Sequence, residues 1–339
     1  MATQAENLAD LVALTLAELG KFKWTDIAST LQSYPFARKL LVKKARKTLT
    51  GKSIQFNLMS KEANLAKWVG LYEADNYYRP DGAIQGTVPW RHGNANFVID
   101  RREIAMNADP AQIVDLVAFE RAQAMSAKAK LIEIAGWGGP TSASDDKTMF
   151  GFPYWIQPNA TTGFNGGDNS YFAAGPAGLA SATYANWKNY TIRYSAVDAA
   201  FLDDIRKAAG YTEWEPPVEM PQYDTGEAVE LYTTWTCRKG LVNLLESRND
   251  NLGWSLDDRD PVFQKSKILW VPRLDSDATN PLYGINWGTF KFVFLKGENM
   301  VQTGPRPVPG MHVAVATDID WSFNLVCYDR RKNWMANTA

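Results

Sequence analysis

The segment that most constrains the fold is the run from Asp109 to Gly136, which contains proline only at its second position and glycine only at its end. Aspartate before the first turn and proline at its first position favour a helix start, and Gly136 suits the left-handed position that ends a helix. At ~1.5 Å per residue such a helix would be roughly 40 Å long, whereas helices average about 11–12 residues. We therefore predict a rod-like helix over residues 110–136.

The segment before this helix, residues 48–106, is predicted to be extended. SIQFNLMS alternates as a strand does, and TVPWRHGNANFVIDRREIAM returns as a second extended stretch after a turn at residues 79–82. Between them, aromatic residues stand among polar ones, and such an arm cannot bury them on itself. The arm either folds onto the body or docks on another chain. We expect docking, with these residues contacting a neighbouring subunit: Trp68, Tyr72, Tyr77, Tyr78 and Arg79.

The N-terminal region contains a strongly basic stretch. No acid occurs between Ile27 and Lys61, although eight lysines and arginines do. A solvated face explains such a stretch, and so does a segment that lies against acids of a neighbour or against packaged nucleic acid. Four of these residues are predicted to face either a neighbouring subunit or the lumen of an assembly: Lys43, Lys44, Arg46 and Lys47.

Composition excludes several classes of protein. A chain of 339 residues that is 45% hydrophobic is globular and long enough for about two domains. A net charge of −1 argues against a dedicated nucleic-acid binder. The first residues lack the basic region of a signal peptide, and no apolar run approaches the ~18 residues of a membrane span. Cys237 and Cys327 lie in strand-like runs and are expected to be buried thiols.

The sequence contains no recognisable catalytic or metal-binding signature. The glycine clusters do not lead from a strand into a helix as a nucleotide loop requires. DSDATNP, from Asp275, resembles a calcium loop but has Asn280 at its sixth position and Asn286 at its twelfth. We predict no catalytic residue, no cofactor and no metal site. A carbohydrate-active enzyme stays open as an alternative, because two paired carboxylates need no local signature.

The rest of the chain mixes helices and strands without strict alternation, which indicates an α+β fold. Helices are expected over residues 198–210 and 239–250. Strands are expected over residues 187–195, 230–238, 267–274, 285–295 and 312–329.

The order of these segments resembles that of tailed-bacteriophage major capsid proteins with the Hong Kong 97-type fold. KFKWTDIASTLQSYPFARKLL is similar to their N-terminal arm, and TNPLYGINWGTFKFVFLKGENM with WSFNLVCYDRRKNWM to their closing stretch. The resemblance implies five parts. They are an N-terminal arm (1–47), an extended loop (48–106), a peripheral domain with a spine helix (107–187), an axial domain (188–285) and closing strands of the peripheral domain (286–339).

The resemblance also implies a function. The chain would assemble with itself into hexamers and pentamers of an icosahedral head, made in the host cytoplasm, that encloses double-stranded DNA in the virion. Its partners would be portal, scaffold and decoration proteins, with packaged DNA touched non-specifically and no membrane. It would not be an enzyme. The alternatives are an encapsulin-like nanocompartment shell and, from a different class, the carbohydrate-active enzyme.

Overall fold

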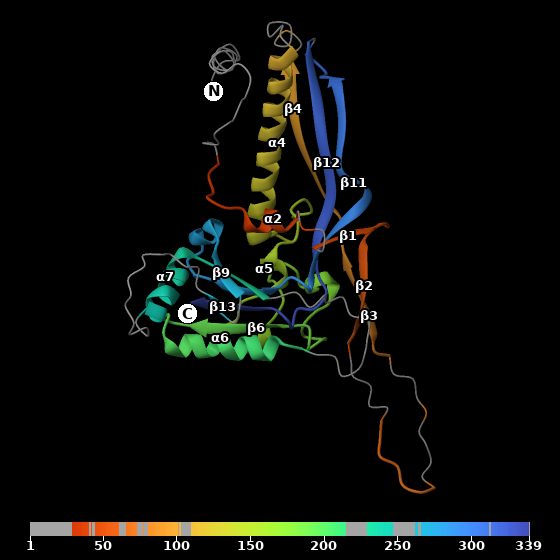
Figure 1. The fold of residues 1–339 in the computed structure, drawn as a ribbon. Helices are drawn as coiled ribbons and strands as arrows, with labels where there is room; N and C mark the ends of the chain where they lie inside the picture. The colour runs from red at the N-terminus through yellow and green to blue at the C-terminus, as the bar shows by residue number, and fades with distance from the viewer. Residues whose placement is uncertain are drawn as a thin grey trace.

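The computed structural model describes residues 29–40, 42, 45–60, 66–72, 77, 81–100, 102, 110–214, 229–246, 262–263, 266–311 and 313–338. A long helix, α4 (Pro110–Gly138), rises beside a four-stranded sheet, and a seven-stranded sheet lies at its foot (Figure 1). This mixture confirms the predicted α+β class. None of the helices in the described ranges is both long and apolar enough to cross a bilayer.

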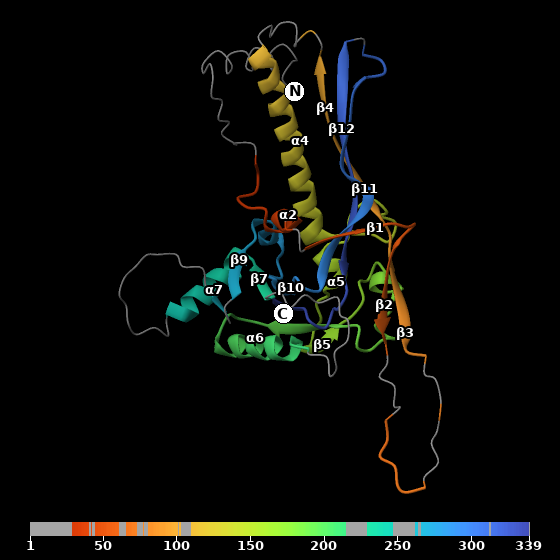
Figure 2. The same ribbon diagram turned by 45° about the vertical axis from the view of Figure 1, so that its right-hand side comes forward.

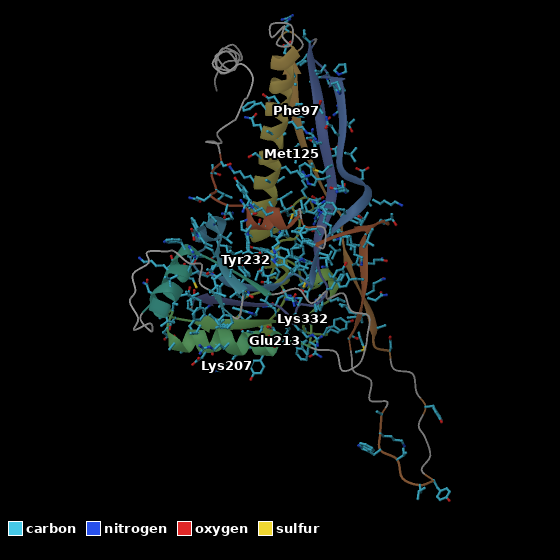
Figure 3. The ribbon with its side chains drawn as sticks, viewed as in Figure 1. Phe97, Met125, Lys207, Glu213, Tyr232 and Lys332 are labelled. Atoms are coloured by element: carbon cyan, nitrogen blue, oxygen red, sulfur yellow. The ribbon has the colours of Figure 1, made fainter. Side chains whose placement is uncertain are left out.

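The four-stranded sheet and α4 form one projecting unit. Its strand order is β1-β11-β12-β4, with β1 parallel to β11 and the other pairs antiparallel. Phe97 and Ile99 of β4 and Ile319 of β12 pack with Ala124 of α4, and Met125 joins them from the helix (Figure 3). The bounds are β1 (Arg46–Leu49), β4 (Arg91–Asp100), β11 (Phe290–Pro307) and β12 (Ala314–Cys327).

Helix α4 continues past Gly136, which was predicted to end it. Gly136 lies inside the helix, and a Cβ atom there would lie 2.5 Å from the ring of Phe36. Phe36 belongs to the short helix α2 (Pro35–Leu40), which packs across α4. The left-handed residue after the helix is Gly139, with φ +64°. Gly136 is therefore a close-packing position, not a helix terminus.

The seven-stranded sheet has the order β5-β6-β13-β10-β7-β9-β8. Helix α6 (Ala199–Thr212) packs on β6, and the side chain of Asp198 caps it by accepting from the Phe201 N–H at 2.9 Å. The second helix of this region is α7 (Trp235–Glu246). The strands are β5 (Gly163–Gly166), β6 (Asn189–Tyr194), β7 (Val229–Thr233), β8 (Val262–Phe263), β9 (Ser266–Trp270), β10 (Leu282–Asn286) and β13 (Trp334–Thr338).

The start of α7 differs from the sequence-based prediction. The strand expected over 230–238 ends at Thr233, because the Thr234 hydroxyl accepts from the Cys237 N–H at 3.3 Å and starts α7 there. Cys237 is thus helical, although Cys237 and Cys327 are both free and buried as predicted. Near the C-terminal end, β13 pairs with β10 and β6, whereas β11 and β12 belong to the other sheet.

Short elements and one arginine fill the junction between the two sheets. The elements are α5 (Phe152–Trp155) and the 3-10 helices η2 (Pro176–Gly178) and η3 (Pro272–Ser276). Arg330 is fully buried beside α5. Its guanidinium donates to the carbonyls of Trp155, Trp187 and Gly167 at 2.6–2.7 Å. Arg330 therefore joins α5 to the chain at Gly167 and Trp187.

Candidate inter-subunit surfaces

The hairpin of β2 (Ile54–Met59) and β3 (Ala83–Val88) has a firmly packed base. Ile54, Phe56 and Val88 are almost fully buried. The Phe56 ring packs edge-on against Tyr328, with centroids 5.3 Å apart, and lies directly over Gly86. The Trp90 indole donates to the Gly51 carbonyl at 2.8 Å. The base is rigid, so it fixes the direction in which the arm projects (Figures 1 and 2).

The far end of this arm is exposed. The exposed fractions of Trp68, Leu71 and Tyr72 are 101%, 93% and 103%, and that of Tyr77 is 89%. Tyr78 and Arg79 lie outside the described residues. Large apolar side chains gathered in such an exposed stretch typically mark an interaction site. The expectation that they contact a neighbouring subunit remains a prediction.

The basic residues of the N-terminal region divide into two pairs. Lys43 and Lys44 lie outside the described residues. Arg46 and Lys47 are half-buried on β1: Arg46 donates to the Leu40 carbonyl and lies 5.9 Å from the Phe294 ring, and Lys47 lies 5.3 Å from that of Tyr328. Both therefore pack on aromatic rings of their own chain. That they face a neighbour or the lumen remains a prediction.

Helix α2 fastens the N-terminal region to the body through contacts that the sequence did not reveal. The buried carboxylate of Glu133 on α4 accepts from the Ala37 N–H at 2.9 Å and from the Trp137 indole at 2.7 Å. Burial raises the pKa of Glu133, and these donors oppose the rise. Lys39 pairs with Glu230 of β7. The only local signal was the run of bases, which gives no indication of acids about a hundred or more residues away.

A second charged group of α4, Lys128, is buried without a carboxylate beside it in the described part of the chain. Its ammonium contacts the Met300 sulfur and lies 4.2 Å from the Trp321 ring. Burial, with a smaller contribution from Arg46, lowers the pKa of Lys128 to about 8. The face of the Trp321 ring attracts the ammonium and offsets part of the free-energy cost of burying it.

We expect Lys128→Met to raise the free energy of unfolding of the free subunit by about 1–2 kcal/mol at pH 7. The unfolded chain holds this proton up to its ordinary pKa of 10.5, but the folded chain releases it near 8. The wild type therefore gains stability between these pH values, and the advantage of the variant shrinks. Urea denaturation of the wild type and of Lys128→Met at pH 7 and pH 9.5 measures the two differences in the free energy of unfolding. Lys130→Met is the control on the same helix, and a less stable Lys128→Met at pH 7 would contradict the prediction.

A cavity of about 210 Å³ lies at the foot of α4, between the helix, β4 and β12. Ile132, Ala135 and Met149 are among the apolar side chains that line it, while Arg91, His92 and Lys147 are its charged or titratable lining residues. Within the described part of the chain, no carboxylate lines this cavity. The paired acids that a glycosidase requires are thus missing from this cavity.

The calcium-like segment that begins at Asp275 is held by hydrogen bonds within the fold. Among the described residues, no group of three His, Cys, Asp or Glu side chains could hold a metal ion. In the calcium-like segment, the Asp275 carboxylate accepts from the Trp235 N–H at 2.7 Å and the Trp270 indole at 2.8 Å. It therefore joins α7 to β9 and acts as a structural cap.

Comparison with known proteins gives a likeness of fold. No protein-family model matches the chain, and no curated protein matches it. A solved capsid asymmetric unit of cyanophage A-1(L) superposes with a TM-score of 0.61 at 14% identity, over 96% of this chain and 98% of that one. The capsid of a native GTA particle superposes with a TM-score of 0.58 at 12% identity, over 95% of this chain and 96% of that one. The capsid asymmetric unit of cyanophage Pam1 superposes with a TM-score of 0.51 at 12% identity, over 95% of this chain and 96% of that one.

Proposed function

We propose that this chain, which has the Hong Kong 97-type fold of the phage capsid structures it matches, is a major capsid protein. It assembles with itself into an icosahedral head around double-stranded DNA. The observation that carries the proposal is the exposed end of the β2–β3 hairpin, where Trp68, Leu71 and Tyr72 have almost no cover. Likeness over nearly the whole length of capsid chains supports it.

A projecting arm suits such an assembly physically. Each subunit of a shell must hold several neighbours, and many modest contacts then sum to a stable particle. In this proposal α4 and the four-stranded sheet form the peripheral part of a hexamer or pentamer, and the seven-stranded sheet forms its axial part. Portal, scaffold and decoration proteins are further proposed partners. DNA contacts are non-specific, and Lys43 and Lys44 are candidates for them.

Electron microscopy and size-exclusion chromatography of the purified chain test the proposal. Closed shells, or hexamers and pentamers, are the expected result. Protection of double-stranded DNA from nuclease inside particles made in a phage infection distinguishes a phage head from an encapsulin-like shell with protein cargo. A chain that stays monomeric at every concentration, alone and with the other head proteins, would overturn the proposal.

Trp68→Ala is expected to lower particle yield by at least about tenfold, because a buried tryptophan at an interface is often worth 2 kcal/mol or more. The thermal midpoint of the free subunit should not change, since the side chain is 101% exposed. Trp68→Phe, which keeps an aromatic ring, is the matched control and should retain most of the yield. An unchanged yield for Trp68→Ala would remove Trp68 from the interface.

A further inference from the structure

We propose that the cavity at the foot of α4 is a binding site for a small aromatic carboxylate, a molecule with one apolar ring system and one anionic head group. The ring system lies between α4, β4 and β12, and the carboxylate stays at the mouth of the cavity beside two basic side chains. This inference goes beyond the proposed function, because it assigns a small-molecule site to the single chain and does not depend on assembly.

The interior of the cavity is apolar and large enough for such a ring. Five of its lining residues are buried in the chain and still leave it unfilled: Ile132, Ala135, Met149, Trp321 and Phe323. Its volume is about 210 Å³, whereas an apolar cavity of about 150 Å³ is enough to take up benzene. The space therefore holds an aromatic ring system with a short substituent, in contact with the rings of Trp321 and Phe323.

The aromatic wall of the cavity is already fixed in the free chain. The Trp321 indole packs over Gly93, where a Cβ atom would lie 2.4 Å from the ring. The Lys128 ammonium lies 4.2 Å from the centroid of the same ring. Because these contacts hold the indole in place, little ordering is required when a ligand enters, and this lowers the free-energy cost of binding.

The cavity is accessible from solvent along α4. Leu131 lines it yet is 56% exposed, and Ile134 on the next turn of the helix is 37% exposed. Lys147, which also lines the cavity, is exposed as well. A small molecule can therefore enter from water without unfolding of the surrounding elements.

The charged side chains that line the cavity are basic. They are Lys147 and the half-buried Arg91. The Arg91 guanidinium donates to the backbone carbonyls of Asp145 and Asp146, the former at 3.1 Å. Its buried Nε has no hydrogen-bond partner in the described part of the chain. A buried donor without an acceptor is costly, and a carboxylate oxygen at the mouth supplies that acceptor.

The acids next to Lys147 in the sequence do not contribute a carboxylate to the lining. The Asp145 carboxylate accepts from the backbone N–H groups of Lys147 and Thr148, at 3.1 and 3.0 Å, and so closes a turn. Asp146 is exposed and is not one of the lining residues. Charge complementarity therefore favours an anionic head group over a neutral or cationic one.

Calorimetric titration of the free subunit with two matched probes tests the inference. Naphthylacetate and naphthylethanol share a ring system and differ in the head group, which is a carboxylate in the first and a hydroxyl in the second. Naphthylacetate is expected to saturate a single site and to bind at least about tenfold more tightly at pH 7 and low salt. Equal affinities of the two probes, or no saturable binding of naphthylacetate, would overturn the proposal.

Two variants locate the binding site. Lys147→Gln is expected to weaken naphthylacetate about threefold and to leave naphthylethanol unchanged, whereas Lys130→Gln, a change on α4 outside the cavity lining, should affect neither probe. Ala135→Leu fills the interior and should abolish binding of both probes without lowering the thermal midpoint. Ala143→Leu, at an exposed position outside the lining, is its control.

Binding of naphthylacetate that survives in a folded Ala135→Leu subunit would place the molecule elsewhere and overturn the proposal. If Ala135→Leu lowers the thermal midpoint, Lys147→Gln decides, because its side chain is exposed and its loss does not disturb the core. Unchanged affinity for naphthylacetate in Lys147→Gln would then overturn the assignment of the head group, and with it the proposal. Neither result bears on assembly, so the proposed function is tested separately.

Discussion

Replacing Arg330 with methionine is expected to lower the free energy of unfolding by about 3–5 kcal/mol. The guanidinium donates to the carbonyls of Trp155, Trp187 and Gly167 at 2.6, 2.7 and 2.6 Å. Methionine fills much of the same volume but leaves these buried acceptors without donors, at about 1–3 kcal/mol each. Burial lowers the pKa of Arg330 to about 10, so removing the cation recovers part of this loss.

Chemical denaturation of the free subunit measures the effect. Arg331→Met is the matched control. Arg331 is the next residue in the chain, its side chain is about a third exposed, and it pairs with Asp329. That variant should lose less than about 1 kcal/mol. If Arg330→Met loses as little stability as Arg331→Met, water or a small rearrangement replaces the donors of Arg330, and the prediction is wrong.

Arg330 also shows where reasoning from the sequence stops. Its carbonyl partners lie 143 to 175 residues away in the chain. Nothing in the run DRRKNW separates the fully buried Arg330 from the partly exposed Arg331. The same holds for Glu133 and Ala37, whose contact spans 96 residues. Backbone acceptors carry no sequence signal, so such contacts appear only once the fold is known.

Features set by local sequence were predictable. The start of α4 at Pro110 and its unusual length follow from a run without helix breakers. Strand β2 was recognisable because buried Ile54 and Phe56 alternate with exposed Gln55 and Asn57. The exposure of Trp68 and Tyr72 followed from an arm too polar to form its own core. In the proposed assembly these aromatic side chains meet residues of another molecule, which the sequence of one chain does not specify.

The end of α4 was predicted wrongly for a reason that leads to a second prediction. Gly136 and Gly138 both lie in the last turn, and helix propensity alone treats them alike. At Gly136 a Cβ atom would lie 2.5 Å from the Phe36 ring, while at Gly138 it would meet nothing within 4 Å. Phe36 has no room to retreat, because its ring packs edge-on against Phe152 and Phe292 at 5.2 and 5.3 Å.

Gly136→Ala is therefore expected to destabilise the subunit by about 2–3 kcal/mol, since it forces Phe36 out of its site. Gly138→Ala should stabilise it slightly, by up to about 1 kcal/mol. Thermal denaturation measures whether the midpoint falls in Gly136→Ala and rises in Gly138→Ala. Limited proteolysis adds a structural reading, because a displaced Phe36 would release α2 and expose the bonds around Lys39 and Arg46 to trypsin in Gly136→Ala alone. Equal, small effects of the two alanines would show that α2 is not held by this contact, and the N-terminal region would then be anchored chiefly by Glu133 and the Lys39–Glu230 pair.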